Sequence, residues 1–223
     1  MKPKLSILIA TIGQREQRLT RLLDILKPQV YKLKGAVEVV AYWNNGEFPL
    51  WQIRQKLLEE AKGEYVSFID DDDLVPDYYC DEIIEALKAK PDYVGWRMQV
   101  WHNGEKLKPT YHSLIYPRWY DDNKGFYRNI SHLNPIKRSL ALKASFEVER
   151  GVAEDESWVV RVTPLVHTQV YIDKEMYWYQ HTSGDSVWRG DVKKYNRYTR
   201  PPMRRRYFRW HPSSKKYHIP GQK

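Results

Sequence analysis

The stretch that decides the fold covers residues 65–73 and reads Tyr-Val-Ser-Phe-Ile-Asp-Asp-Asp-Asp. Its first five residues form a short, mostly apolar run, which predicts a buried strand. Four consecutive carboxylates, Asp70, Asp71, Asp72 and Asp73, follow this strand directly. Because carboxylates this close together repel one another, they need a positive charge among them. The stretch therefore predicts a strand whose carboxyl end carries a charged site.

Upstream of this stretch, strand and helix patterns alternate. Apolar runs at residues 5–10 and 37–43 predict two more buried strands. A stripe of leucines after the first run predicts a helix that ends at Pro28, and residues 51–61 carry a second helical pattern. The first part of the chain therefore reads as repeated strand–helix units.

Downstream, Pro76 predicts the start of a helix over residues 77–90. Repeated strand–helix units indicate an α/β fold with a mostly parallel, Rossmann-like sheet flanked by helices. Ligands of such sheets bind at the carboxyl ends of the strands. We therefore expect the site at the edge where residues 10–13, 43–46 and 70–73 converge.

The second half of the chain is less regular. Residues 93–101 and 176–181 have strand patterns, and residues 135–146 and 154–162 have helical ones. Residues 103–129 mix turn formers with aromatic residues and support no assignment.

Length and composition limit the class of protein. A chain of 223 residues fits one domain with its own core, and its single cysteine, Cys80, excludes an intrachain disulfide. The longest apolar stretch near the start is too short for a signal peptide or a membrane span, so we expect a soluble, cytoplasmic protein with no transmembrane segment.

The positive charge is concentrated near the C-terminus. Residues 190–223 hold eleven Lys or Arg and one acid, so this segment has a net charge of +10. The whole chain has a net charge of +9, and the remaining residues are therefore close to −1. Aromatic residues alternate with these cations, a pattern that suits DNA or RNA, or an anionic membrane surface. A segment folded back on the body, with its arginines in solvent, is an equally ordinary interpretation.

The acidic run admits two interpretations. Mg²⁺ and Mn²⁺ prefer oxygen ligands and commonly link protein carboxylates to a diphosphate. Alternatively, the run is a solvated turn in which Asp73 caps the following helix. Its position after a parallel strand favours the metal and phosphate interpretation.

Residues 63–76 resemble the strand and DxD motif of family 2 glycosyltransferases. Further matches follow in the family's order along residues 5 to about 188: the first two strands, Arg54, the pair Glu154 and Asp155, and then Tyr179, His181 and Ser186. The resemblance implies a GT-A fold in a catalytic domain of residues 1–189. Its nucleotide-sugar half would span about 1–101 and its acceptor half about 102–189, with 190–223 as a basic, aromatic extension.

The resemblance also implies ligand sites. The metal, Mn²⁺ or Mg²⁺, would be held by Asp72 and Asp70, with His181 as a third ligand; the alternative for His181 is a packed, hydrogen-bonded side chain. A nucleoside-diphosphate sugar, with a UDP-sugar favoured, would contact Thr11, Ile12, Gly13, Arg15, Asn44, Arg54, Asp70 and Asp71. Asn44 stands where the family has an aspartate that reads the base, and its amide oxygen can accept a hydrogen bond from uracil.

For catalysis, Asp155 is the candidate general base, with Glu154 beside it, because the acceptor hydroxyl must lose its proton as it attacks. The resemblance implies inversion of the anomeric configuration. The alternative for this acidic pair is a first helical turn that complements the helix dipole.

The acceptor stays open: a glycan, a lipid, a protein, or hydroxylated bases in DNA, the last favoured by the basic segment 190–223. A compact enzyme of this kind would suit a virus or phage. The competing hypotheses are a nucleotidyltransferase, a metal-dependent nuclease and a non-catalytic nucleic-acid-binding protein.

Overall fold

The structure is a computed structural model that describes residues 2–148, 153–182 and 207–210. The helices are α1 (Glu16–Lys32), α2 (Leu50–Glu60), α3 (Tyr79–Ala86), α4 (Arg138–Ala141) and α5 (Glu154–Val162), with 3-10 turns at Gly13–Arg15, Leu87–Ala89 and Thr163–Leu165. The strands are β1 (Leu5–Ile12), β2 (Val37–Asn44), β3 (Tyr65–Phe68), β4 (Tyr93–His102), β5 (Glu105–Lys106), β6 (Thr110–His112), β7 (Tyr120–Asp121), β8 (Phe126–Arg128), β9 (Ile136–Lys137), β10 (Gln169–His181) and β11 (Tyr207–Trp210).

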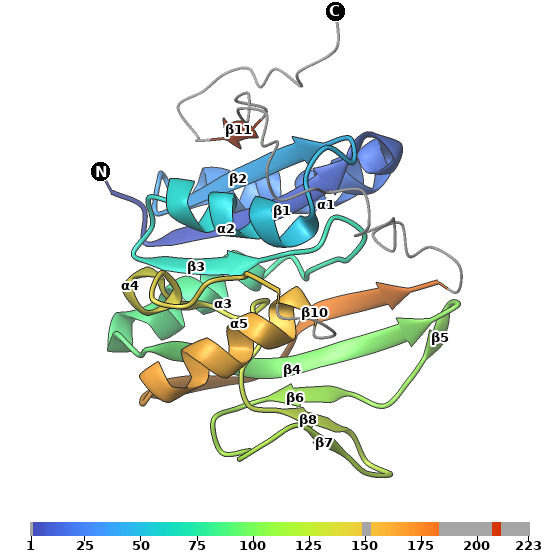
Figure 1. The fold of residues 1–223 in the computed structure, drawn as a ribbon, viewed down its shortest axis with the longest axis vertical. Coiled ribbons are helices and arrows are strands. Elements are labelled where there is room, and N and C mark those ends of the chain that lie inside the picture. The colour runs from blue at the N-terminus through green and yellow to red at the C-terminus, as the bar shows by residue number, and fades with distance from the viewer. Residues whose placement is uncertain (1, 149–152, 183–206, 211–223) are drawn as a thin grey trace, which may run out of the picture.

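The strands form one sheet with a parallel centre (Figure 1). β1 lies between β2 and β3 and pairs with both in parallel, so the three strands end at the same edge. Beyond β3, the order continues through β9, β4, β6, β8 and β7, while β10 pairs with β4 in parallel. The expected α/β class, with a mostly parallel core flanked by helices, is confirmed.

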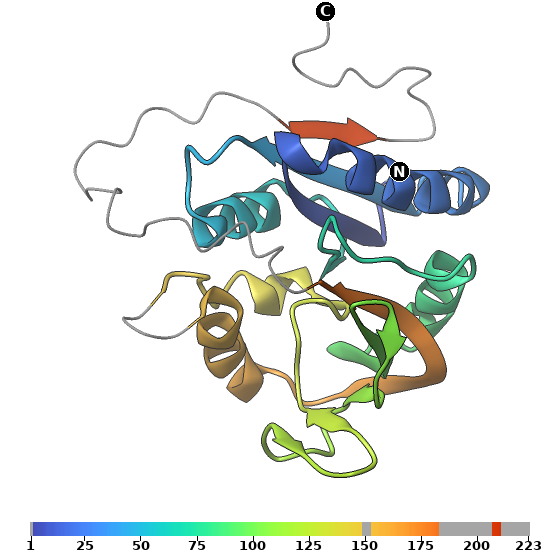
Figure 2. The same ribbon diagram turned by 90° about the vertical axis from the view of Figure 1, so that its right-hand side faces the viewer.

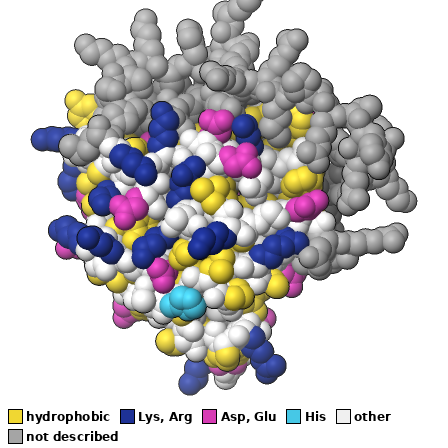
Figure 3. Space-filling view, turned by 60° about the vertical axis from the view of Figure 1, so that its left-hand side comes forward, with side chains coloured by type: hydrophobic (Ala, Val, Ile, Leu, Met, Phe, Trp, Pro, Cys, Tyr) yellow, Lys and Arg dark blue, Asp and Glu magenta, His cyan; other side chains and the backbone are white. Residues whose placement is uncertain are grey.

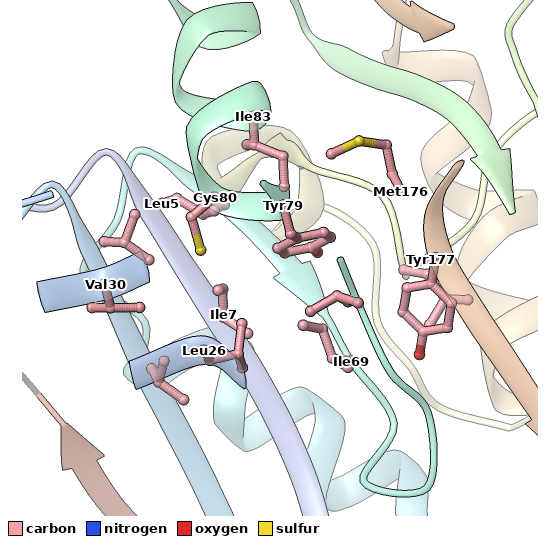
Figure 4. Packing of buried hydrophobic residues seen from close by; sticks show 14 of the residues in the cluster. Leu5, Ile7, Leu26, Val30, Ile69, Tyr79, Cys80, Ile83, Met176 and Tyr177 are labelled. Carbon is pink, nitrogen blue, oxygen red and sulfur yellow. The ribbon is translucent and has the colours of Figure 1, made fainter. Parts of the chain in front are cut away.

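Both faces of this sheet are covered, as the uniformly apolar strand runs require. Along β1, Leu5, Ile7 and Ile9 pack in one hydrophobic cluster, and Leu8 and Ala10 in the other. In the first cluster, residues of β1 face those of α1, and α3 and β10 lie next to them (Figure 4). The second cluster lies under α2 and α5. Seen from a second direction, the helices lie on the two sides of the sheet (Figure 2). Successive apolar side chains of β1 therefore alternate between two hydrophobic cores, one on each face of the sheet.

One predicted helix end is wrong. α1 continues through Pro28 to Lys32, although proline cannot donate a backbone hydrogen bond within a helix. The next turn is held by tertiary contacts: Val30 is buried, and the Gln29 side chain donates to the Pro76 carbonyl at 3.0 Å and accepts from the Cys80 amide at 2.9 Å. These contacts outweigh the local signal.

Residues 135–146 are likewise not one helix. They contain β9 and the short helix α4. Ile136 of β9 pairs with Val66 of β3 and with Tyr93 of β4, so this segment joins the two strands. Pairing with two strands that lie far away in sequence therefore outweighs the helical preference of this segment.

The remaining expected elements differ mainly at their ends. The helix over 154–162 has the predicted bounds, and the strands over 5–10, 37–43, 65–69 and 93–101 are present. The helix predicted over 77–90 ends earlier, at Ala86, with a 3-10 turn after it. The last predicted strand is longer, because β10 begins at Gln169 rather than at residue 176.

Residues 103–129 form short strands with an aromatic stack. The rings of Tyr111 and Tyr127 stack at 5.3 Å between centroids, and those of Tyr120 and Tyr127 at 4.6 Å. Arg128 lies over the Trp119 ring at 5.1 Å. This region is held by contacts between aromatic rings, which have no regular spacing in the sequence. Its strands were therefore not predicted from a pattern of buried residues.

The basic segment 190–223 is described only at β11, which pairs with β2 in antiparallel orientation. On the side shown in Figure 3, Lys and Arg side chains are scattered with Asp and Glu among them. Within the described residues, no helix is long and apolar enough to cross a membrane. The division of residues 1–189 into two halves stays a prediction.

His112 provides a test of this packing. Its ring is buried, its Nδ1 lies 2.6 Å from Asn134 Oδ1, and burial lowers the pKa of His112 to about 4. The unfolded chain binds this proton near 6.5 and the folded chain only near 4, so stability falls as the pH falls through this window. Denaturant unfolding at about pH 7 and about pH 5 should reveal a linked loss of about 2 kcal/mol.

His112→Gln should remove that part of the pH dependence, whereas His167→Gln, at an exposed position, should keep it. Equal pH dependence in the wild type and His112→Gln would show that His112 does not titrate as described.

Candidate active site

The four carboxylates after β3 alternate between buried and open positions. Asp71 and Asp73 are 3% and 1% exposed, whereas the side chains of Asp70 and Asp72 are 30% and 21% exposed. A turn closed by the bond from the Asp73 amide to the Asp70 carbonyl, 3.1 Å long, sets this alternation. The buried pair holds the turn, and the open pair faces outward.

The two buried carboxylates fasten the turn to its neighbours. Asp71 accepts from Thr11 Oγ1 of β1 at 2.7 Å and from Arg15 Nη1 at 2.8 Å. Asp73 accepts from Tyr177 Oη and from the Gln180 amide of β10, each at 2.7 Å. The acidic turn is thereby fixed from both sides, and each buried carboxyl group is hydrogen-bonded.

Arg54 joins this turn to the acidic start of α5. Its side chain is 5% exposed, its Nη2 lies 2.9 Å from Asp70 Oδ1, and its Nη1 lies 3.0 Å from Glu154 Oε1. Burial alone would lower the pKa of Arg54, but the charges of Asp70, Glu154 and Asp155 raise it. The guanidinium is therefore a permanent positive charge between two motifs that are far apart in sequence.

Arg15 is the second buried cation. Its Nη1 lies 2.8 Å from Asp71 Oδ1 and 2.8 Å from Asp72 Oδ2, and Arg18 Nη1 lies 3.7 Å from the same oxygen of Asp72. Burial and the neighbouring charge of Asp70 raise the pKa of Asp72 to about 6, against the attraction of Arg15. The two open carboxylates thus each lie beside an arginine, Asp72 beside Arg15 and Asp70 beside Arg54.

Asp155 lies in the first turn of α5, with its side chain 33% exposed. Its Oδ1 accepts from the Glu156 amide at 2.9 Å, and its Oδ2 lies 3.9 Å from His132 Nδ1. Burial, followed by the charge of Arg54, lowers the pKa of His132 well below its ordinary value. His132 is therefore neutral at physiological pH, and its contact with Asp155 is not an ion pair.

Two tyrosines of β10 complete the surroundings. The hydroxyl of Tyr177 accepts from the Asp70 amide at 3.1 Å and donates to Asp73. Burial and the charges of Asp73, Asp70 and Asp72 raise the pKa of Tyr179 to about 12, and Asp155 adds to this effect. Tyr179 thus lies within the field of both acidic groups and keeps its proton.

Sequence reasoning missed Tyr177 and His132 as site residues. Neither has a local signal: Tyr177 belongs to an aromatic run, and His132 lies in a loop outside any motif. Tyr177 contacts Asp73, which lies 104 positions away in the sequence. His132 approaches Asp155 because α5 packs beside its loop. Only the paired strands bring these groups together.

Asn44 is engaged in shaping a loop. Its side chain is buried, its Oδ1 accepts from the Glu47 and Phe48 amides at 3.1 and 3.2 Å, and its Nδ2 donates to the Phe48 carbonyl at 2.9 Å. Both lone pairs of the amide oxygen are used in the turn after β2. The contact between this oxygen and a base stays a prediction.

At the end of β1, Thr11 and Ile12 are buried and Gly13 is partly exposed. A Cβ added at Gly13 would lie 3.1 Å from Asn45 Oδ1 and 3.4 Å from Trp43 Nε1. Gly13 therefore lets the ends of β1 and β2 approach closely. Of this predicted trio, Thr11 contacts the acidic turn directly.

His181 is paired with His102 across the ends of β10 and β4. Their Nδ1 atoms are 2.8 Å apart and their rings stack at 4.9 Å between centroids. Among the described residues, no group of three or more His, Cys, Asp or Glu is arranged to hold a metal ion. The structure thus brings Asp70 and Asp72 together but does not group His181 with them.

The Tyr177 hydroxyl can be tested by stability. Tyr177→Phe leaves the Asp70 amide without its partner and removes one of the two hydrogen bonds to Asp73, which should cost about 1–3 kcal/mol of unfolding free energy in urea. Tyr179→Phe, on the same strand and half-buried, is the matched control and should cost clearly less. Equal losses in the two variants would contradict the fastening role of Tyr177.

Comparison with known proteins agrees with this geometry. Residues 52–147 match the family described as Glycosyl transferase family 2. The structure of S. aureus TarS 1-349 has the same fold, with a TM-score of 0.58 and 17% identity over 79% of this chain and 60% of that one. The same TarS segment in complex with UDP-GlcNAc matches 82% of this chain and 60% of that one, with a TM-score of 0.57 and 17% identity.

A longer TarS structure matches 79% of this chain, with a TM-score of 0.57 and 16% identity, but the match covers only 36% of that chain. This chain thus spans well under two thirds of the TarS structures it matches. No curated protein matches the chain by sequence. The chain therefore shares the GT-A fold of TarS, and its residues 52–147 match the glycosyl transferase family 2 description.

Proposed function

We propose that this chain transfers a sugar from a nucleoside-diphosphate sugar to an acceptor hydroxyl, with a divalent cation at the donor and Asp155 as the general base. The observation that carries the proposal is the bridge made by Arg54 between Asp70 and Glu154, with lengths of 2.9 and 3.0 Å. This bridge supports a single site in which Asp70 serves the donor and the acids at the start of α5 serve the acceptor. A transfer reaction needs both groups within reach of one anomeric carbon.

The donor set fits Mn²⁺ or Mg²⁺ held by Asp70 and Asp72 and completed by phosphate oxygens. Such cations are commonly bound through one or two carboxylates together with substrate phosphates, so a third protein ligand is not required. The support is the partial exposure of these two carboxylates and the charge of Asp70, which helps raise the pKa of Asp72. When bound, the cation supplies charge neutralisation at the leaving diphosphate.

Asp155 serves the acceptor. The acceptor oxygen forms a bond to the anomeric carbon while the bond from that carbon to the diphosphate oxygen breaks, and the electron pair leaves with the diphosphate. The acceptor's proton passes to the Asp155 carboxylate, which is one-third exposed and accepts a hydrogen bond from the Glu156 amide through Oδ1. Attack from the face opposite the diphosphate inverts the anomeric configuration.

A UDP-sugar is the favoured donor. TarS, which shares the fold, has been solved with UDP-GlcNAc and with UDP. The base would lie against the ends of β1 and β2, near Trp43 and Asn45, whose side chains lie close to Gly13. Asn44 supports this surface from below through its loop contacts.

The acceptor is a glycan, a lipid, a protein or hydroxylated bases in DNA. The eleven cations of residues 190–223 support a polyanionic acceptor or an anionic membrane surface near the enzyme. The pairing of β11 with β2 attaches part of this segment to the edge of the sheet.

Donor binding can be tested without the acceptor. UDP with Mn²⁺ at about 100 times its dissociation constant should stabilise the fold by about 2.7 kcal/mol, which raises the melting temperature by about 5–10 °C. UDP or Mn²⁺ alone should give a smaller shift, and GDP, ADP, dTDP and CMP serve as competitors.

Asp72→Asn should abolish the joint shift, whereas Asp77→Asn, at an exposed position just beyond the turn, should keep it. No shift with any nucleotide and metal pair would overturn the proposal.

The general base can be tested by turnover. Asp155→Asn should lower the rate of UDP release from a UDP-sugar by about 10²–10⁴-fold, with the UDP-dependent thermal shift retained. Glu156→Gln, an exposed residue of the same turn, should keep the rate. A wild-type rate in Asp155→Asn, with water or any added acceptor, would remove Asp155 from the mechanism.

A further inference from the structure

Two arginines already lie close to Asp72, one of the two open carboxylates of the acidic turn. Arg15 Nη1 lies 2.8 Å from Asp72 Oδ2, and Arg18 Nη1 lies 3.7 Å from the same oxygen. Arg15 also holds the buried Asp71 at 2.8 Å, so it cannot move far without leaving that charge uncompensated. Asp72 is therefore held by cations of the chain itself.

The two arginines differ in access. The side chain of Arg15 is 8% exposed and that of Arg18 is 42% exposed. Arg15 lies in the 3-10 turn after β1, and Arg18 lies in the first turn of α1. The two arginines form a cationic wall, that is, a pair of positive charges beside Asp72. Arg15 is the buried residue of this pair, and Arg18 is the one that solvent reaches.

A divalent cation at Asp72 meets this wall directly. Two positive charges about 4 Å apart at an effective dielectric constant of about 20 repel by several kcal/mol before screening. The cation also shares Asp72 with Arg15, so each weakens the other's attraction to that carboxylate. A diphosphate changes the balance, because its negative oxygens can face the cation and the arginines at the same time.

We infer that Arg15 and Arg18 couple metal binding to donor binding: they hold Asp72 in the free enzyme, oppose the cation alone, and contact the diphosphate once cation and donor bind together. The inference rests on the proposed function and adds that the cation and the donor bind cooperatively at its site. Because coupling between ligands is reciprocal, the nucleotide must strengthen metal binding by the same factor as the metal strengthens nucleotide binding.

The test is direct metal binding, without turnover. The Mn²⁺ dissociation constant is measured by electron paramagnetic resonance of the free ion, with no nucleotide and with saturating UDP, for the full chain and its variants. In the wild type, UDP should tighten Mn²⁺ binding by about 10–100-fold. In Arg15→Gln, Mn²⁺ alone should bind about 10-fold more tightly, UDP alone should bind more weakly, and the coupling factor should fall.

Three variants complete the design. Arg15→Lys keeps the charge and should restore most of the coupling. Arg18→Gln, at a more exposed position, keeps the contact of Arg15 with Asp71 and should change metal binding in the same direction by a smaller factor, about 3-fold. Arg21→Gln removes one exposed charge farther along the same helix and should leave both affinities unchanged. If Arg15→Gln does not fold, Arg18→Gln against Arg21→Gln decides the question.

The outcomes separate this inference from the proposed function. Cooperative binding of Mn²⁺ and UDP in the wild type, with the metal-only affinity unchanged or weakened in Arg15→Gln and Arg18→Gln, overturns the inference and leaves the proposed function standing. A wild-type chain that binds no nucleotide with any metal overturns both. Tighter metal-only binding in both variants, with reduced coupling to UDP, supports the inference.

Discussion

Four carboxylates in succession at the end of a buried strand repel one another. Arginines and hydrogen-bond donors from several surrounding elements offset this repulsion. Two buried guanidiniums, Arg15 and Arg54, lie on either side of the turn. A carboxylate that lost such a partner in a poorly solvated position would become strongly destabilising. The helices and strands around the turn deliver these positive charges, and Asp70 and Asp72 stay partly exposed.

The fold delivers these charges from separate places. Arg15 comes from the turn after β1, Arg54 from α2, and Glu154 from the start of α5. The parallel pairing of β1 with β2 and β3 puts their carboxyl ends at one edge, so a turn after β1 lies beside a turn after β3. β10 reaches the same edge through its pairing with β4 and brings the Tyr177 hydroxyl to the acidic turn. A GT-A sheet thus works here as a scaffold that gathers short polar segments.

Sequence patterns predicted most of the strands because a strand covered on both faces is apolar throughout, and that signal is local. The same reasoning failed at Pro28 and over residues 135–146, where contacts from elsewhere outweighed local preference. The Gln29 side chain ties the end of α1 to Pro76 and Cys80, and Ile136 must bridge β3 and β4. Residues 103–129 offered no pattern because stacked tyrosine rings, rather than periodic burial, hold them.

The sequence by itself determined that a charged run follows β3, that acids also begin α5, and that segments resembling family 2 motifs occur in order. Each of these is a short run of residues, so its chemistry can be read without knowing its neighbours. Only the tertiary structure decided which carboxylates are buried and which are open, and that Arg54 joins Asp70 to Glu154, which lies 100 residues beyond Arg54 in the chain. It also decided that Asn44 shapes a loop and that His132 lies beside Asp155. These facts depend on strand register and helix packing, which arise from contacts between distant segments and leave no local mark in the sequence.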